Sequence, residues 1–191
     1  MSELNSVQAS LTYLVDTGVK PATYLYLPGA DPKRTIGDYR PYDVTVHDAR
    51  PIVNRFRLEQ EGFELHRLDT KVTDFFDADQ RRKIYDPEIE QLVLKVSGAQ
   101  RVVVFDQTIR VQSDETRAEK GVREPVPMVH NDYTETSGPQ RVRDLMGDEA
   151  DGLLENRFAV VNVWRPVKGP VLTWPLTLCD ARSLAAGDLV A

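Results

Sequence analysis

Cysteine and histidine are scarce in this 191-residue sequence, which has one cysteine, Cys179, and three histidines. A single cysteine excludes a disulfide within the chain and is typical of proteins from a reducing compartment. The first ten residues lack the basic start and apolar core of a signal peptide. No apolar run approaches the roughly 18 residues that a membrane-spanning helix needs. We therefore expect a cytoplasmic protein without a membrane partner.

Charge of one sign is not concentrated anywhere in the chain. The sequence has 24 Lys and Arg against 30 Asp and Glu, a net charge of -6. A nucleic-acid surface needs a clustered basic face, so no nucleic-acid partner is expected. The glycine patterns of dinucleotide-binding, P-loop and α/β-hydrolase proteins are absent, which excludes those classes. The composition, with 41% hydrophobic residues, predicts a single globular domain over residues 1–191.

Short runs rich in β-branched and aromatic residues predict strands. These runs cover residues 10–15, 22–27, 43–47, 101–105, 108–111 and 158–164. Residues 28–42 contain three prolines and two glycines and predict a loop. Helices and strands do not alternate regularly, which argues against a doubly wound sheet. We expect an α+β chain that is mainly β.

The clearest predicted helix runs from Asp86 to Gly98. Asp86 is placed to cap its start, Pro87 suits the first turn, and Gly98 suits a left-handed end. A second helix is predicted over residues 140–154, with a weak point at Gly147. Residues 112–124 are polar and are expected to be mobile, while residues 55–68 fit a helix and a strand equally well.

Two residues form the strongest candidate for chemistry, His130 and Asp132. At the end of an extended strand, residues i and i+2 point to the same side, so the imidazole and the carboxylate would meet at one point. Such a pair supplies two thirds of the two-histidine, one-carboxylate triad that holds iron(II). The alternative is a solvated turn in which Asp132 caps the next few residues.

The surrounding sequence resembles a family of iron(II)- and 2-oxoglutarate-dependent oxygenases. The segment PVPMVHNDYTETSGPQRV is similar to the iron-ligand segment of gibberellin desaturase, aspergillic-acid hydroxylase and cephamycin methoxylation proteins. It also resembles that of an endoperoxide-forming enzyme of fungal meroterpenoid biosynthesis. Further similar stretches are VTVHDAR, GFEL, SGAQRVVVFDQTIR and NRFAVVNVWRPVKGPVLTWPLTLCDARS. Their order and spacing also fit, and they extend the resemblance over nearly the whole chain.

The resemblance implies a double-stranded β-helix, or jelly-roll, core with flanking helices. It also implies iron(II), 2-oxoglutarate and dioxygen, and the hydroxylation or desaturation of a small secondary metabolite. His130 and Asp132 would be metal ligands. The chain resembles the N-terminal and central part of such a protein, so the C-terminal strands are expected to be missing. Sheet edges left open would favour a homo-oligomer.

The sequence departs from the family in one respect: no histidine follows His130. The second iron histidine of the family comes after the H-x-D pair, as does the arginine that binds 2-oxoglutarate. His47 and His66 are the other histidines, but both precede the pair. A second hypothesis is therefore a non-catalytic relative or helper protein of the same fold that binds a ligand or partner without turnover.

Six further residues are candidates for the site, each with a structural alternative. Asn162, Arg165 and Arg141 are candidates for cosubstrate binding. The alternative for Arg165 is a salt bridge, and the alternative for Arg141, which the sequence favours, is a solvated helix surface.

Tyr133, Thr134 and Trp164 are candidates for contact with the substrate. Thr134 could instead cap a turn, and Trp164 could instead fill a core. Cys179 is expected to be a buried thiol, and Arg182 and Ser183 are expected to fix a loop.

Overall fold

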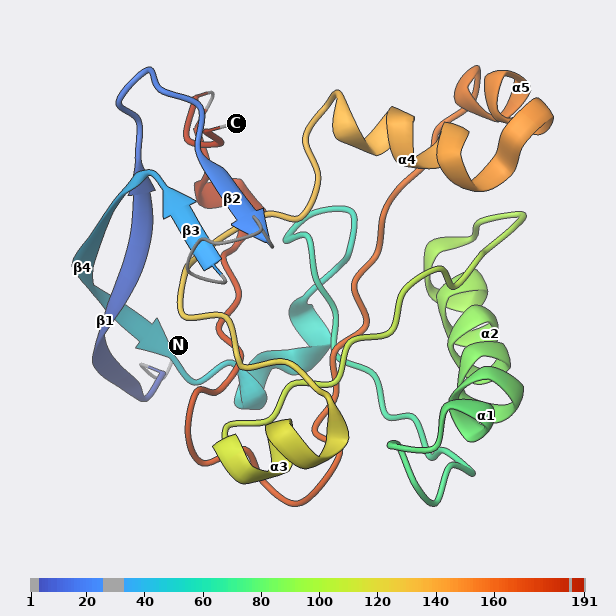
Figure 1. Ribbon diagram of the computed structural model, residues 1–191, viewed down its shortest axis with the longest axis horizontal. Coiled ribbons are helices and arrows are strands. Elements are labelled where there is room, and N and C mark those ends of the chain that lie inside the picture. The colour runs from blue at the N-terminus through green and yellow to red at the C-terminus, as the bar shows by residue number, and fades with distance from the viewer. Residues whose placement is uncertain (1–3, 26–32, 186, 191) are drawn as a thin grey trace. The chain divides into compact units, whose positions relative to one another are not determined.

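The computed structural model describes residues 4–25, 33–185 and 187–190. Within them, strands pair in two separate two-stranded sheets, and the helices follow later in the chain (Figure 1). The combination of helices and strands confirms the α+β expectation, whereas the expectation of a mainly β chain is not met in the described residues, where helices contain more residues than strands. No helix in the described residues is long and apolar enough to cross a membrane.

The chain divides into two compact units, each built from separate stretches of sequence. Unit 1 comprises Met1–Phe63, Val126–Ser137 and Thr177–Ala191. Unit 2 comprises Glu64–Pro125 and Gly138–Leu176. The prediction of a single domain stays a prediction, and each unit is described by itself.

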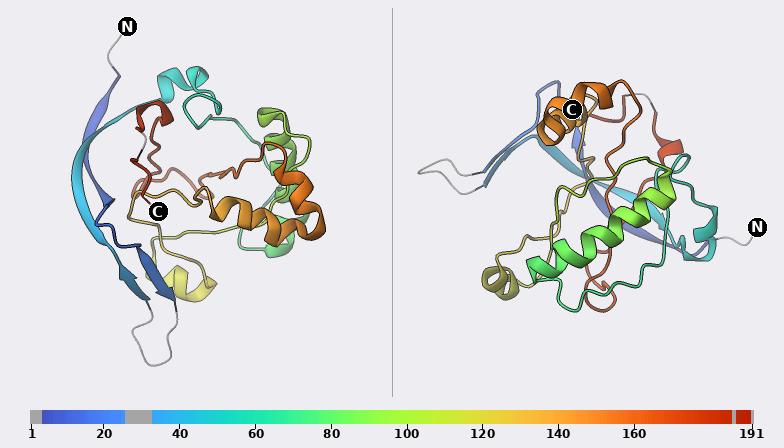
Figure 2. Two further views of the ribbon diagram at one scale, coloured as in Figure 1. Left: turned by 90° about the horizontal axis from the view of Figure 1, so that it is seen from above. Right: turned by 90° about the vertical axis from the view of Figure 1, so that its right-hand side faces the viewer.

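Unit 1 is organised by a long antiparallel ribbon of β1 (Ser6–Val15) and β4 (Asp38–His47). The register runs without interruption from Ser6 opposite His47 to Val15 opposite Asp38. Because side chains alternate along a strand, one face of the ribbon is largely apolar. That face carries Val7, Ala9, Leu11, Tyr13 and Val15 of β1 and Tyr42, Val44 and Val46 of β4. Figure 2 shows the ribbon curving along its length.

Pro41 lies in the middle of β4, opposite Thr12 of β1. The Thr12 carbonyl accepts a hydrogen bond from the amide of Val129, on the side of β1 away from β4. The Thr12–Pro41 pair is therefore a non-hydrogen-bonded pair, and the Pro41 nitrogen faces the outer edge, where no donor is missed. This placement explains why a proline is tolerated and why the loop prediction for residues 28–42 is wrong over the first part of β4.

A second, short ribbon joins β2 (Ala22–Leu25) to β3 (Lys33–Ile36). The strand predicted over residues 22–27 is confirmed for Ala22–Leu25, and residues 26–27 lie outside the described residues. β3 is a second correction to the loop predicted over residues 28–42, of which residues 28–32 lie outside the described residues.

The helix predicted from Asp86 is confirmed as α2 (Asp86–Ser97), but it continues an earlier helical segment. That segment consists of α1 (Ala78–Gln80) and a π-helical turn, η2 (Arg81–Tyr85). The cap is Asp77, whose side chain accepts from the amides of Asp79 and Gln80. Asp86 lies inside the helix, and its side chain accepts from Gln107. The prediction of Asp86 as the cap is therefore wrong.

The π-helical turn directly precedes Pro87, which lacks the backbone donor of an α-helix interior. The amide of Asp86 bonds to the carbonyl of Arg81, five residues back, rather than four. Such local widening accommodates proline within a continuous helix. At the other end, Gly98 adopts the predicted left-handed conformation with φ 68°.

Residues predicted to be mobile contain the short helix α3 (Asp114–Lys120). Ser113 caps its start by accepting from the amide of Thr116, and Gly121 ends it in a left-handed conformation. The prediction missed this helix because polar residues without an apolar stripe carry no periodic signal.

The helix predicted over residues 140–154 is confirmed in three pieces, with the break where it was expected. They are α4 (Ser137–Met146), the 3-10 turn η3 (Gly147–Glu149) and α5 (Ala150–Leu154). Gly147 has a φ of 54°, a value that favours glycine. Two further 3-10 turns, η1 (Arg50–Arg55) and η4 (Ala181–Ser183), lie in unit 1.

The strands predicted at residues 101–105, 108–111 and 158–164 do not form sheets in the described part of the chain. In this part of the chain, an isolated β-bridge joins Arg110 to Arg123. Residues 158–164 form no hydrogen-bonded pairing with another described strand. Strand-forming side chains need a partner surface, and here Val103, Phe158 and Trp164 stay 40–50% exposed. The jelly-roll core stays a prediction, since the paired strands described lie within residues 6–47.

Unit 1 is held together around Glu61, whose side chain is 3% exposed. Its carboxylate accepts from the amide of Arg57 at 2.6 Å and pairs with the guanidinium of Arg182 at 2.8 Å. The amide of Ala181 donates to the Glu61 carbonyl at 2.9 Å. These bonds join the turn after η1 to the 3-10 turn η4.

The loop that carries Arg182 is fixed by its own contacts. Asp180 caps η4, accepting from the amide of Arg182 at 3.0 Å and from its guanidinium at 2.6 Å. The Ser183 hydroxyl donates to the Asp180 carbonyl at 2.7 Å. The hydrogen bond from the Arg182 side chain lowers the pKa of Asp180. The prediction that Arg182 and Ser183 fix a loop is confirmed.

Replacing Glu61 with alanine should lower the free energy of unfolding by about 2 kcal/mol, because the Arg57 amide and the Arg182 guanidinium would lose a buried acceptor. Urea unfolding followed by circular dichroism measures this change. Asp69→Ala is the matched control, because Asp69 pairs with Arg67 while 81% exposed and should change stability by less than about 0.5 kcal/mol. Equal effects of the two variants would contradict the role given to Glu61.

The Asp77 cap should make the helical segment of unit 2 sensitive to acid. Hydrogen bonds from the amides of Gln80 and Asp79 lower the pKa of Asp77. Its stabilising effect is therefore present above the unfolded pKa of about 3.9 and is lost as the pH falls through the lower folded pKa. Asparagine caps without titrating, so Asp77→Asn should lose less helicity than the wild type between pH ~4 and pH ~2.

Circular dichroism at 222 nm, recorded as the pH is lowered, gives the comparison. Asp79→Asn, which removes a neighbouring carboxylate bonded to Lys83, should behave like the wild type. Identical acid profiles for Asp77→Asn and the wild type would show that the cap does not control this transition.

Candidate metal centre

The segment before His130 is extended and is attached to β1 by backbone contacts. Met128 forms a parallel bridge with Thr12, and the Val129 amide donates to the Thr12 carbonyl at 2.9 Å. The two prolines of this segment, Pro125 and Pro127, favour an extended backbone. His130 therefore directly follows a segment anchored on the central ribbon of unit 1.

His130 is oriented by its own backbone neighbourhood. Its Nδ1 lies 2.8 Å from the carbonyl oxygen of Met128, which can only accept, so Nδ1 carries the hydrogen of this contact. In the neutral ring, Nε2 is then the atom with the free electron pair. A hydrogen bond of this kind is the usual device for orienting a metal-binding histidine.

The Nε2 of His130 faces the carboxylate of Asp132, at 3.5 Å from Oδ1. Both side chains are about half exposed, 47% and 45%, so an ion can reach them from solvent. Ligands at about 2.1 Å from one ion can lie up to roughly 4 Å apart, so both atoms can bind the same ion. Imidazole nitrogen and carboxylate oxygen are the donors of the iron(II) facial triad.

The described residues contain no group of three or more His, Cys, Asp or Glu side chains placed to hold a metal. His47 ends β4 opposite Ser6. His66 is exposed, as expected, and its Nε2 contacts Glu64 at 2.7 Å. Neither histidine joins His130 and Asp132 in a described group of possible metal ligands, so the described part of this chain offers two candidate ligands rather than three.

Thr134 stands where α4 begins, and its contacts match the structural alternative. Its amide donates to the Ser137 hydroxyl at 2.8 Å, while the Ser137 amide donates to the Thr134 hydroxyl at 3.1 Å. This reciprocal pair satisfies donors at the start of the helix. The Tyr133 carbonyl accepts from the Asn131 side chain at 3.0 Å, which closes the turn around Asp132.

The remaining candidates lie in unit 2, so they are not brought together with His130 within one unit. Asn162 is exposed, and Trp164 is 50% exposed rather than part of a core. Arg141 lies on α4 with its guanidinium 5.8 Å from the centre of the Phe105 ring.

Arg165 is the most enclosed of these residues. Its guanidinium carbon lies 5.2 Å from the centre of the Phe75 ring and 5.8 Å from that of Tyr85. Nε and Nη1 are buried without a hydrogen-bond partner. Burial raises the pKa of Tyr85, and the positive charge of Arg165 opposes that rise.

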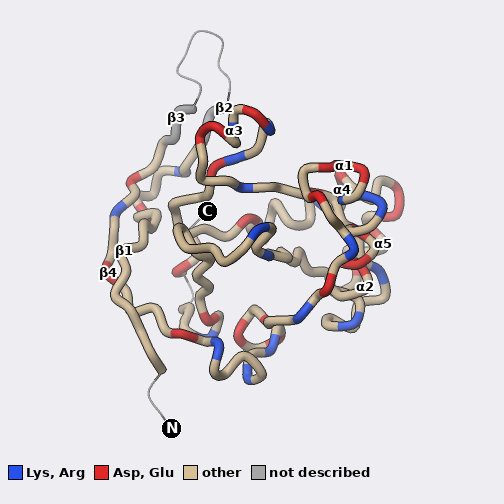
Figure 3. The backbone as a smooth tube through the Cα atoms, turned by 90° about the horizontal axis from the view of Figure 1, so that it is seen from below, with Lys and Arg blue, Asp and Glu red and all other residues tan. Residues whose placement is uncertain are grey.

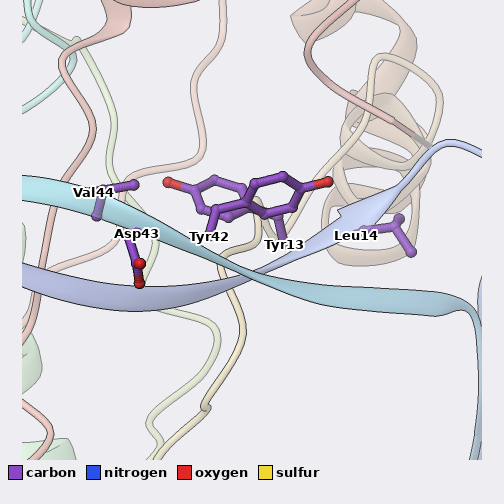
Figure 4. Close-up of a pocket in the computed structure, with 5 residues that line it drawn as sticks. All are labelled: Tyr13, Leu14, Tyr42, Asp43 and Val44. Carbon is purple, nitrogen blue, oxygen red and sulfur yellow. The ribbon is translucent and has the colours of Figure 1, made fainter.

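A shallow depression on the β1–β4 ribbon, with a mixed polar and apolar lining, was not predicted from the sequence. Tyr13, Leu14, Tyr42, Asp43 and Val44 line it, and the Tyr13 and Tyr42 rings meet edge to face with centres 5.9 Å apart (Figure 4). The strand-forming residues of SLTYLV and DVTVH predicted two strands but not their pairing, and the pairing is what brings the two rings together.

Cys179 is exposed, which corrects the expectation of a buried thiol. The neighbouring Leu176 and Leu178 are themselves 46% and 47% exposed. The described residues therefore do not bury the apolar run before Cys179. Acidic and basic residues are interspersed along the backbone (Figure 3).

Comparisons with known proteins place the chain in a family. The family described as "Oxidoreductase/YMDC permease-like domain" matches residues 11–191. The Fe(II)/2-oxoglutarate-dependent dioxygenase nvfI of Aspergillus novofumigatus is 33% identical over 182 residues, 91% of this chain and 64% of that protein. The hydroxylase/desaturase CTB9 of Cercospora beticola is 32% identical over 163 residues, 79% of this chain and 50% of that protein. The chain thus spans between half and two thirds of these relatives.

Solved structures with a similar fold include the iron and alpha-ketoglutarate-dependent endoperoxidase NvfI. One of them, with a different conformation, matches with a TM-score of 0.63 at 24% identity, over 81% of this chain and 57% of that one. Another has a TM-score of 0.60 at 23% identity, over 78% and 55%. The family resemblance expected from the sequence is confirmed: the chain belongs to the oxidoreductase/YMDC permease-like family and groups with fungal Fe(II)/2-oxoglutarate-dependent dioxygenases and hydroxylase/desaturases.

Proposed function

We propose that the protein is a non-haem iron(II)- and 2-oxoglutarate-dependent oxygenase with a jelly-roll core. It would hydroxylate or desaturate a small secondary metabolite, with dioxygen as the oxidant. The observation that carries the proposal is the orientation of His130. Its Nδ1 is engaged by the Met128 carbonyl, and its Nε2 faces Asp132 at 3.5 Å. The names of the relatives support the same chemistry.

In this proposal, His130 and Asp132 would hold iron(II). Together with 2-oxoglutarate and dioxygen, the bound iron would supply the oxidising chemistry that removes hydrogen from an unactivated carbon. His130 binds through Nε2, and the Met128 carbonyl keeps its ring in the required tautomer. The Asp132 carboxylate offsets part of the positive charge. The bond between Val129 and Thr12 limits movement of the pair relative to β1.

The substrate side of the proposal is supported by the depression around Tyr13 and Tyr42. It lies in the same unit as His130, and the metal-binding segment is attached to β1 at Thr12, next to Tyr13. Aromatic faces bind flat apolar molecules, and the two hydroxyls add polar contacts. Tyr133, Thr134 and Trp164 stay proposed substrate contacts, and Asn162, Arg165 and Arg141 stay proposed contacts of the cosubstrate.

A second candidate function is a non-catalytic relative that binds a ligand or partner without turnover. It is favoured by the finding that His130 and Asp132 have no third His, Cys, Asp or Glu ligand among the described residues. In either case, a cytoplasmic location and a homo-oligomer stay predictions from the sequence.

Anaerobic titration with iron(II) and 2-oxoglutarate separates the two functions. The proposed oxygenase should give the weak visible charge-transfer band of the chelated complex. His130→Ala or Asp132→Ala should weaken iron binding by at least about tenfold, because each removes one of two protein ligands. His66→Ala is the matched control, because it removes an exposed histidine that also contacts a carboxylate. It should leave the band unchanged.

No band in the wild-type chain, together with no decarboxylation of 2-oxoglutarate, would favour the non-catalytic relative. A band that survives in Asp132→Ala but disappears in His66→Ala would contradict the site proposed here.

The depression on the ribbon should bind an uncharged, flat apolar probe such as 1-naphthol. With 3-fluorotyrosine incorporated, the fluorine signals of Tyr13 and Tyr42 should shift together as the probe is added. Tyr42→Ala should weaken binding by roughly three- to tenfold, the effect of losing one aromatic contact. Tyr39→Ala removes a ring on the opposite face of β4 and should have little effect. Equal losses in the two variants would contradict binding at this face.

A further inference from the structure

Arg165 is a cation enclosed by two aromatic rings. Phe75 and Tyr85 meet edge to face, with centres 5.2 Å apart at 80°, and the guanidinium carbon lies within 6 Å of both. Contact with a ring face stabilises the charge. The Tyr85 hydroxyl also forms a hydrogen bond with the Arg165 side chain, which opposes the rise in the pKa of Tyr85, but one acceptor does not satisfy the five donors of a guanidinium. The aromatic cage formed by Phe75 and Tyr85 therefore leaves part of the hydrogen-bonding capacity of the guanidinium unsatisfied.

Two nitrogens of Arg165, Nε and Nη1, have no hydrogen-bond partner in the described part of the chain. They belong to different edges of the guanidinium, so a carboxylate bound along either edge would pair one of them together with Nη2. A buried donor without an acceptor is costly, and a native structure seldom leaves two on one charged group. Among the described residues no acceptor faces these two donors, and an anion that binds from solution would supply one.

Carboxylates close to the cage are already engaged by other donors. Asp86 accepts from Gln107, and Glu88 accepts from the Thr70 hydroxyl at 2.5 Å and the Lys71 amide at 3.0 Å. No ion pair among the described residues includes Arg165. The positive charge of Arg165 is therefore not neutralised by the acidic residues next to it.

We propose that Arg165 anchors a binding site for a small carboxylate in unit 2, with Phe75 and Tyr85 as its walls. Both rings are only partly buried, so the cage lies near the surface, and rotation of a ring opens a path to the guanidinium. The carboxylate forms two parallel hydrogen bonds with the guanidinium, and the rings limit competition from water. The site extends the proposed function through Arg165 but requires no metal.

Two molecules could bring this carboxylate: 2-oxoglutarate, or an organic acid acting as substrate. The test uses the whole chain in EDTA, with arginine labelled by ¹⁵N, and follows the Nε–H signals during titration with succinate and with 2-oxoglutarate. Arg165→Lys identifies the Arg165 signal by its loss. That signal should shift and saturate with both acids, whereas sodium chloride at equal ionic strength should not reproduce the shift.

Calorimetry on the variants completes the test. Arg165→Lys keeps the charge but loses the planar pair of donors, and should weaken carboxylate binding by about tenfold. Arg101→Gln removes an arginine of the same unit that is paired with Glu149 at the surface, and should leave binding unchanged. Phe75→Leu keeps Arg165 but removes one aromatic wall, so it should weaken carboxylate binding by a smaller factor than Arg165→Lys. It replaces Arg165→Lys as the test variant if that variant does not fold.

Tighter binding of 2-oxoglutarate than of succinate would identify the cosubstrate as the source, and equal binding would identify a general carboxylate site. A shift that does not saturate, or that chloride reproduces, would overturn the inference. Because EDTA removes metal, failure here leaves the iron titration of the proposed function unaffected, and failure of the iron titration leaves this site intact.

Discussion

The hydrogen bond from the amide of Val129 to the carbonyl of Thr12 is the contact on which the candidate site depends. It attaches a segment without secondary structure of its own to the centre of the β1–β4 ribbon, beside the pair of Thr12 and Pro41. Pro41 lacks an amide donor, so the outer edge of β4 is a poor place for a further strand to pair. The segment pairs with β1 instead. His130 comes immediately after this segment and is oriented by the carbonyl of Met128. Strand pairing, proline placement and the orientation of the His130 imidazole thus meet in one local arrangement.

Features with local causes were predictable from the sequence. Runs of β-branched and aromatic residues indicated parts of β1 and β4, Pro87 and Gly98 indicated α2, and Gly147 indicated the break between α4 and α5. Features that depend on distant partners were not predictable. Asp86 resembled a cap, but the π-helical turn before Pro87 extends the helix back to Asp77. Residues 158–164 have strand-forming side chains, yet no described segment pairs with them.

The same distinction applies to the site. The spacing of His130 and Asp132 predicted that the two side chains lie together. The tautomer of the His130 ring follows from its contact with the Met128 carbonyl, which the sequence does not reveal. Arg165 was recognised as a candidate through its NVWRP segment. Its cage comes from Phe75 and Tyr85, which lie 80 or more positions earlier in the chain. The pairing of Tyr13 with Tyr42 likewise needs the register of the ribbon.

The central claim is that His130 offers Nε2 to a metal next to Asp132. Long-range ¹H–¹⁵N spectra of the three histidine side chains test it most directly, with zinc(II) as a diamagnetic substitute for iron(II). We expect the metal-free His130 to have its hydrogen on Nδ1, and its Nε2 signal to move on addition of zinc(II) while His66 stays unchanged. A hydrogen on Nε2, or a zinc response confined to His47 or His66, would contradict the account.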